Sequence, residues 1–191
     1  MPARLTEQET ARIHAAVTAA ETRARAHIAF VAVPMSERYA LHPIVWGALI
    51  ALVAAGIGSF IWHPLSFRDG FAAEAVLFCV VSLVLEWQPL KLLLVPGHIK
   101  RDHARALAHR EFAARILASP ERKGGVLLFV SLGERYAELI ADREAHIRVG
   151  QDAWDRILAG FTTAAQSGHV ADAAVAAIEA CGAILESHPP Q

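Results

Sequence analysis

The chain lacks most of the residues and motifs that define familiar classes of enzyme or secreted protein. Its 191 residues include only two cysteines, which form neither a disulfide framework nor a spacing typical of zinc. It contains no glycine-flanked serine elbow, no phosphate-binding loop, no CxxC and no HExxH. A net charge of −1 gives no basis for a nucleic-acid surface. The function therefore has to be inferred from the residues and patterns that the chain does contain.

Charge is also missing from one long stretch. Residues 43–62 carry no charged side chain, and as a helix rising about 1.5 Å per residue they would extend about 30 Å, the thickness of a bilayer's hydrocarbon core. Residues 71–87 form a second apolar run, interrupted by Glu74 and Glu86. The pattern predicts a transmembrane hairpin with residues 63–70 as its loop. The alternative is a buried helical hairpin inside a globular protein, although core helices usually keep a polar stripe.

Small residues recur along both runs at the spacing of one helix face, which lets two helix backbones approach closely. They are Gly47, Ala51, Ala55 and Ser59 in the first run, and Ala75, Cys79 and Ser82 in the second. We therefore expect the two helices to pack on each other. Lysines and arginines flank the hairpin on both sides, whereas its loop holds Arg68 alone. This asymmetry predicts two spans in a bacterial inner membrane, with both termini in the cytoplasm.

The residues outside the hairpin alternate between helical and strand patterns. Thr6 and Glu9 have the spacing of a capping box at the start of a helix. Residues 26–33 are a short run rich in β-branched and aromatic side chains, which predicts a buried strand. Beyond the hairpin the pattern predicts a helix over residues 100–118, strands over 126–131 and 136–141, a helix capped by Asp152, and a last helix over 170–186.

The two most apolar strands predict one sheet assembled from both halves of the chain. The strand at 126–131 needs a parallel neighbour, and the strand at 26–33 supplies one if the helix between them is the crossover of a right-handed βαβ unit. The expected fold class is α/β, a small mixed sheet flanked by helices and interrupted by the two-helix transmembrane hairpin. Residues 1–42 and 88–191 would then form one cytosolic domain.

Two groups of polar residues are candidate sites. Asp142, Glu144 and Asp152 follow the strand pair, and such carboxylates can supply oxygen ligands to Ca²⁺ or Mg²⁺, although a solvated turn has the same composition. The second group lies at the carboxyl ends of the parallel strands, where open α/β sheets commonly bind ligands. It consists of Ser36, Glu37 and Arg38 after the first strand, and Ser131, Glu134 and Arg135 after the second. We expect this edge to face the membrane and to contact lipid or a membrane partner.

Three segments resemble the TPM-domain family, small α/β domains found beside membrane segments in bacteria and plastids. They are the capped helix leading into AHIAFVAVP, the strand pair GGVLLFVSLGERYAELIADRE at residues 124–144, and the ending GHVADAAVAAIEACGAILESHPP. Members are described as auxiliary or quality-control factors for membrane complexes, and a thylakoid relative as a weak acid phosphatase. The resemblance brings no catalytic motif, and Glu144 stands where the family would lead us to expect glycine.

Three functional hypotheses follow from the pattern and the resemblance. The first is a binding or accessory module for another membrane protein, held at the lipid bilayer by the hairpin. The second is a slow phosphatase assisted by a divalent metal at Asp142, Glu144 or Asp152. The third is a purely structural subunit of a membrane assembly. The phosphatase hypothesis rests on kinship alone, because the chain shows no activated nucleophile.

Overall fold

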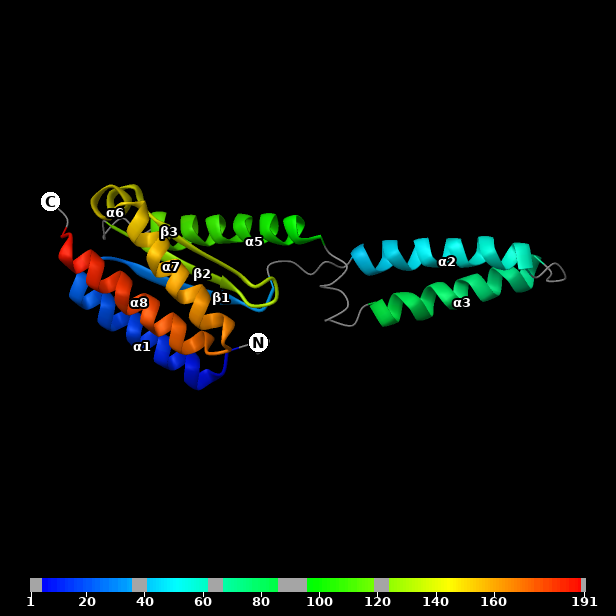
Figure 1. Cartoon of the computed structure of the whole chain (residues 1–191), viewed down its shortest axis with the longest axis horizontal. Coiled ribbons are helices and arrows are strands. Elements are labelled where there is room, and N and C mark those ends of the chain that lie inside the picture. The colour runs from blue at the N-terminus through cyan, green and yellow to red at the C-terminus, as the bar shows by residue number, and fades with distance from the viewer. Residues whose placement is uncertain (1–4, 36–40, 62–66, 86–95, 119–123, 190–191) are drawn as a thin grey trace. The chain divides into compact units, whose positions relative to one another are not determined.

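The computed structural model describes residues 5–35, 41–61, 67–85, 96–118 and 124–189, and most of the structure is helical. The chain forms two compact units. One unit combines residues 1–36 with residues 101–191 and contains a small sheet (Figure 1). The other unit consists of residues 37–100 and contains a helical hairpin. The sheet-containing unit is therefore built from two segments that are far apart in the sequence.

The sheet joins strands from both of those segments. β1 (Ile28–Val33) pairs in parallel with β2 (Val126–Ser131), and β2 pairs antiparallel with β3 (Tyr136–Ala141), so β2 is the central strand. Both pairings, and the bounds of β2 and β3, are those predicted from the sequence. All six residues of β2 are buried. Its continuous apolar sequence follows from this position, because both faces of the strand are covered.

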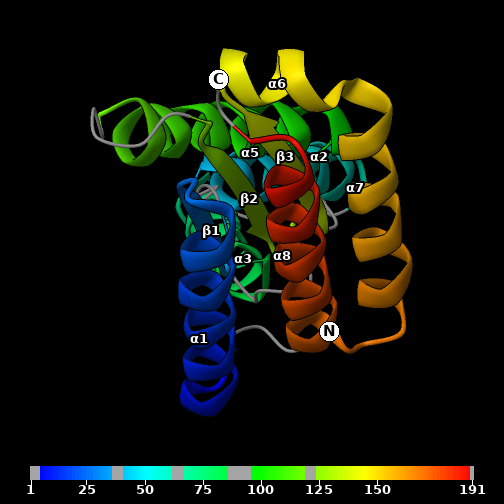
Figure 2. The same ribbon diagram turned by 90° about the vertical axis from the view of Figure 1, so that its left-hand side faces the viewer.

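Helices cover both faces of the sheet (Figures 1 and 2). Alternate side chains of each strand point to opposite faces, so Ile28 and Val126 enter one core while Ala29 and Leu127 enter another. The first core is closed by α1 (Glu7–Ala24), α7 (Gln151–Gln166) and α8 (Val170–Ser187). The second core is closed by α5 (Gly97–Phe112) and by the π-helical segment η1 (Ala113–Leu117) that continues it.

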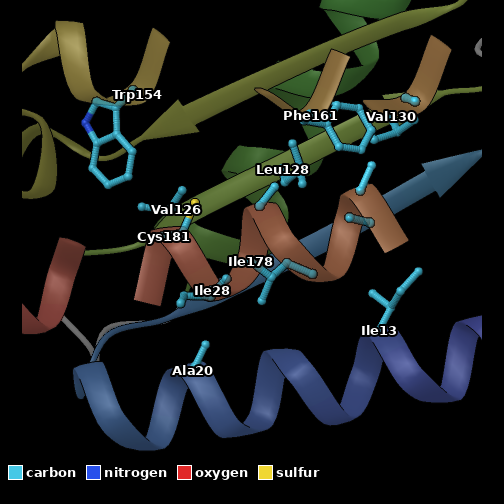
Figure 3. Close-up of a cluster of buried hydrophobic side chains, with 14 of the residues drawn as sticks. Ile13, Ala20, Ile28, Val126, Leu128, Val130, Trp154, Phe161, Ile178 and Cys181 are labelled. Carbon is cyan, nitrogen blue, oxygen red and sulfur yellow. The ribbon is translucent and has the colours of Figure 1, made fainter. Parts of the chain in front are cut away.

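The larger core fills the space between the sheet and the three helices α1, α7 and α8 (Figure 3). Ile13 of α1, Ile178 of α8 and Leu128 of β2 are each no more than 1% exposed. Trp154 and Phe161 contribute the aromatic side chains of α7. This core includes side chains from before and after the hairpin, so neither segment can complete it alone.

The start of α1 is fixed by the capping box that the sequence predicted. The Thr6 hydroxyl accepts the backbone N–H of Glu9 at 3.2 Å, and the Glu9 carboxylate accepts the backbone N–H of Thr6 at 2.8 Å. These reciprocal bonds satisfy donors that have no partner within the helix. The hydrogen bonds from Thr6 also lower the pKa of the Glu9 carboxyl.

One glycine allows α1 and α8 to lie close together. A Cβ added at Gly182 of α8 would lie 2.8 Å from the Cβ of Ala20 and 3.2 Å from its Cα. Ala20 is fully buried, and its own Cα cannot move without moving α1. The pairing of glycine and alanine therefore sets the distance between the two helices.

The second unit is a hairpin formed by α2 (Leu41–Ile61) and α3 (Phe67–Leu85) (Figure 1). Gly47 and Ala51 of α2 are buried where the helices meet, and Ala55 is half-buried. A Cβ at Gly47 would overlap the Ser82 hydroxyl of α3, so glycine permits this close approach. The side chain of Ser59 lies outside the described residues.

The face that α3 turns toward α2 differs from the predicted one. Ala75 and Cys79 are exposed, whereas Phe78 and Ser82 are half-buried and Leu85 is buried. Of the three predicted residues of α3, only Ser82 therefore lies toward α2, against Gly47, and larger side chains complete this face. The sequence pattern of small residues identified the packing face of one helix but did not distinguish it from an exposed face on the other.

No helix among the described residues is both long enough and apolar enough to cross a membrane. α3 contains Arg68, Asp69 and Glu74 within 19 residues. This finding overturns the predicted transmembrane hairpin and the predicted two-span location in an inner membrane. The predicted α/β class is corrected to a mostly helical chain with a three-stranded mixed sheet.

Two local predictions are also corrected. The short helix α6 (Arg143–Val149) follows β3 and is capped by Asp142, a helix that the sequence pattern did not reveal. Gly150, rather than Asp152, is the N-cap residue of α7, and Asp152 lies in the first turn. Gly150 has a φ of 84°, a conformation that glycine adopts without steric cost, and it lets α6 end and α7 begin at one residue.

The close approach of α1 and α8 predicts opposite effects for the same substitution at two glycines. Gly182→Ala should lower the free energy of unfolding by about 1–2 kcal/mol, because overpacking outweighs the gain in helix propensity. Gly160→Ala in α7 should raise it by about 0.5–1 kcal/mol, since a Cβ there meets nothing within 4 Å. Urea denaturation followed by circular dichroism measures both. Two changes of the same sign would contradict the described packing of α1 on α8.

Candidate functional site

A cavity of about 570 Å³ lies at the carboxyl end of β2. Its walls come from the end of β2, the turn into β3, the last turns of α7 and the start of α8. Its size lies in the range of small-molecule sites. The sequence placed a candidate site at this end of the strand, and Ser131 and Arg135 of that prediction line the cavity.

The turn after β2 is pinned to the end of β1. The backbone N–H of Leu132 donates to the carbonyl of Val33 at 3.0 Å, and that of Gly133 donates to the carbonyl of Pro34 at 2.8 Å. A Cβ at Gly133 would lie 2.7 Å from the Pro34 oxygen, so this approach requires glycine. The rim of the cavity is therefore held by backbone bonds rather than left as a free loop.

Arg135 is the cation of this rim. Its φ of 51° places it in the left-handed region, which the turn demands and which arginine adopts at a steric cost. The side chain is exposed, and it makes no hydrogen bond or ion pair with any residue that the structure describes. None of the described residues that line the cavity is acidic. The positive charge of Arg135 is consequently not neutralised by the walls.

The other predicted residues of this edge divide into two groups. The Glu134 carboxylate accepts a hydrogen bond from the hydroxyl of Ser131, which is fully buried at the end of β2. Glu134 therefore stabilises the turn through this bond, and it does not line the cavity. Ser36, Glu37 and Arg38 lie outside the described residues.

The polar residues Thr162 and Gln166 line the cavity from α7, and Ser167 follows them. No spacing in the sequence linked these three residues to Arg135.

A second polar cluster lies between β3 and α5. The Tyr136 hydroxyl donates to one oxygen of the Glu138 carboxylate at 2.8 Å, and the other oxygen lies 3.5 Å from His109 Nε2 and 4.0 Å from Arg105 Nε. Burial raises the pKa of Tyr136 well above its usual range, and the bond to Glu138 and its negative charge raise it further. Tyr136 therefore stays protonated as a hydrogen-bond donor, and the cluster supplies no phenolate nucleophile.

The carboxylates predicted to bind a metal do not come together as a group. Asp142 uses both oxygens on backbone N–H groups: Oδ2 accepts from Gly124 at 2.9 Å and from Gly125 at 2.7 Å, and Oδ1 accepts from Ala145 at 2.7 Å. Glu144 lies in the first turn of α6, and Asp152 lies in the first turn of α7. Among the described residues, no three side chains of histidine, cysteine, aspartate or glutamate form a metal-binding group. Asp142 thus ties the loop before β2 to the start of α6.

The two thiols differ sharply in environment. Cys181 of α8 is 1% exposed, and burial raises the pKa of its thiol to about 12. Cys79 of α3 is exposed. A buried thiol that stays protonated is a packing residue rather than a nucleophile.

Comparisons of the chain with family models, with curated proteins and with solved structures found no match. The resemblance to the TPM-domain family therefore stays a prediction. The arrangement itself defines a sheet covered by helices on both faces, with a rimmed cavity at the carboxyl end of its central strand.

The hydrogen bonds of Asp142 predict a structural effect for its removal. Asp142→Ala should lower the free energy of unfolding by about 2–3 kcal/mol, because it removes a helix cap and leaves two further N–H groups without their acceptor. Asp152→Ala, a matched change at an exposed carboxylate, should cost no more than about 0.5 kcal/mol. Chemical denaturation measures both variants. If Asp142→Ala folds with unchanged stability but loses a Mg²⁺-dependent turnover of p-nitrophenyl phosphate, the structural assignment fails and the phosphatase hypothesis gains.

The two thiols predict a biphasic reaction with a thiol reagent. At pH 8 one thiol per chain, that of Cys79, should react with Ellman's reagent at once, while Cys181 should react only after unfolding, because burial excludes the reagent and raises the pKa of its thiol. In the unfolded chain the thiol has its ordinary pKa of 9.0, so raising the pH above 9.0 should favour unfolding. Cys181→Ala should abolish the slow phase. Equal rates for both thiols in the native protein would contradict the described burial.

Proposed function

We propose that this protein is a binding module that docks on another protein through the hairpin of α2 and α3. The supporting observation is the distribution of exposed apolar side chains. Fourteen of the sixteen large hydrophobic residues that are exposed in the described structure belong to this hairpin, eight on α2 and six on α3. The remaining two are Leu117 and Ile147. Such a concentration of exposed apolar side chains marks an interaction surface.

The hairpin offers apolar surface on more than one side. Gly47 and Ala51 of α2 are already buried between the two helices, whereas the large side chains of α2, such as Leu49, Val53 and Ile57, are exposed. On α3, Val80 and Leu83 are likewise exposed. A two-fold contact with a second copy would cover one side of each hairpin and leave the other uncovered. We therefore infer a heterologous partner whose helices cover both sides.

The composition of the hairpin also specifies the chemistry of the partner. Residues 43–62 carry no charge, so a charged group opposite them would lose its hydration without gaining a partner. The partner surface should consequently be helical, apolar and uncharged. The resembled family is described as auxiliary factors for membrane complexes, which is also a binding function; the resemblance and the function both remain proposals.

The experiment uses a matched pair of isoleucines. Ile57 in the hairpin is 57% exposed and Ile147 in α6 is 69% exposed, so Ile57→Glu and Ile147→Glu should both fold normally. A photo-crosslinking amino acid at position 53 identifies the partner in cells, and the partner is then purified and titrated against the three proteins. Ile57→Glu should weaken binding at least about tenfold, which is about 1.4 kcal/mol, while Ile147→Glu should bind like the wild type.

Three results would overturn the proposal. The first is self-association of the purified chain that Ile57→Glu abolishes, because the occupant of the surface would then be a second copy. The second is binding of the wild type to phosphatidylcholine vesicles that Ile57→Glu abolishes, because the occupant would then be lipid. The third is equal affinity of both variants for the purified partner. Light scattering and vesicle flotation measure the first two.

A further inference from the structure

We propose that the cavity at the carboxyl end of β2 binds a small organic monoanion, a carboxylate with a compact apolar body. This site lies in the sheet-containing unit and is independent of the docking surface on the hairpin. The inference stands on the cavity, on the charge at its rim and on the division of its walls into polar and apolar parts.

The charge of the cavity selects an anion. Arg135 is exposed at the rim and makes no ion pair within the described structure, and none of the described lining residues is acidic; the Glu134 carboxylate of the same turn is bonded to the Ser131 hydroxyl. A guanidinium binds a carboxylate through two parallel hydrogen bonds. Since the described walls contain one arginine and no lysine, a single negative charge is matched and a second would not be.

Gln166 and the start of α8 can supply further hydrogen-bond donors to an anion in the cavity. Gln166 lines the cavity from the end of α7 and carries amide donors. Gly168 and Val170 bring the N-terminus of α8 to the wall, and His169, its N-cap residue, gives no side-chain cap. The first N–H groups of this 18-residue helix therefore bring a partial positive charge to the cavity wall.

The rest of the lining explains why the anion should carry an apolar body. Val130, Ala137, Phe161 and Ala165 form the deeper walls, and Phe161 is only 3% exposed. The hydroxyls of Thr162 and Ser167 donate to carbonyls of their own helix, at 2.9 and 2.7 Å, and so are not available as donors to a ligand. A compact ring or short alkyl chain would cover the apolar walls while its carboxylate reaches the rim.

A phosphate group is a poorer match than a carboxylate. A phosphomonoester carries nearly two charges at pH 7 and presents three strong acceptor oxygens. The described walls offer one guanidinium, one side-chain amide and the first N–H groups of α8, so they match one full negative charge and leave most of a second unmatched. Inorganic phosphate is therefore the discriminating competitor.

The experiment measures binding of benzoate to the full-length protein by isothermal titration calorimetry, with benzamide as its neutral isostere and inorganic phosphate as the competing anion. Benzoate should bind, and benzamide and phosphate should each bind at least about tenfold more weakly. Arg135→Gly should weaken benzoate binding at least about tenfold. Glycine suits the left-handed position of Arg135, so this variant should fold at least as well as the wild type.

The chain offers a matched control for that variant. Arg25 is also an exposed arginine in the left-handed region, with a φ of 50°, and it does not line the cavity. Arg25→Gly should leave benzoate affinity within twofold of the wild type. Equal binding by both glycine variants, equal binding of benzoate and benzamide, or preferential binding of phosphate would overturn the inference. Ile57→Glu tests whether the cavity and the docking surface are independent. It should leave benzoate binding unchanged even if the docking function proves wrong.

Discussion

The parallel pairing of β1 with β2 is the interaction on which the rest of the structure depends. It joins residues 28–33 to residues 126–131, and the hairpin unit lies between them in the sequence. Once the two strands pair, alternate side chains of each enter two separate cores. α1 and α8 can then meet at Ala20 and Gly182, and the turn after β2 can bond to the end of β1. The cavity at the carboxyl end of β2 exists only because that pairing holds its rim.

The two units differ in which apolar side chains they bury. The sheet-containing unit buries its large hydrophobic residues in two cores and leaves only Leu117 and Ile147 among its exposed ones in the described structure. The hairpin buries Gly47 and Ala51 of α2 and Leu85 of α3, and it exposes most of its large side chains. An ordinary globular domain does the reverse, because burying large side chains contributes most of its stability. The hairpin is therefore understandable as half of an interface, with the sheet-containing unit as its stable support.

The sequence predicted the parts of the fold that short-range patterns determine. The bounds of β2 and β3, the pairing of all three strands and the capping box at Thr6 follow from apolar runs, alternation and spacing. The length of an uncharged run was a poorer guide, because it led to a transmembrane hairpin that the described helices do not support. Asp142 shows a related limit of sequence patterns. A carboxylate before a helix has the same sequence pattern whether it caps that helix or binds a metal, and the structure shows that Asp142 caps α6 and accepts three backbone N–H bonds.

One part of the cavity lining was predictable from the sequence, and the part that α7 contributes was not. Ser131 and Arg135 follow a buried strand, so topology alone placed them at its carboxyl end. Thr162 and Gln166 lie some thirty residues further along the chain, and they reach the cavity because α7 packs across the sheet. No local pattern encodes that packing, since it depends on the side chains of several elements at once.

The insertion between β1 and α5 has a consequence for synthesis on the ribosome. β1 leaves the ribosome about ninety residues before β2, so at about 5–20 residues per second it waits roughly 5–20 s for its neighbour. During that time Ile28 and Val31 have no core to enter, whereas α2 and α3, which follow each other closely, can associate as soon as both have emerged. The order of translation thus favours the hairpin first and delays the sheet until the second half of the chain arrives.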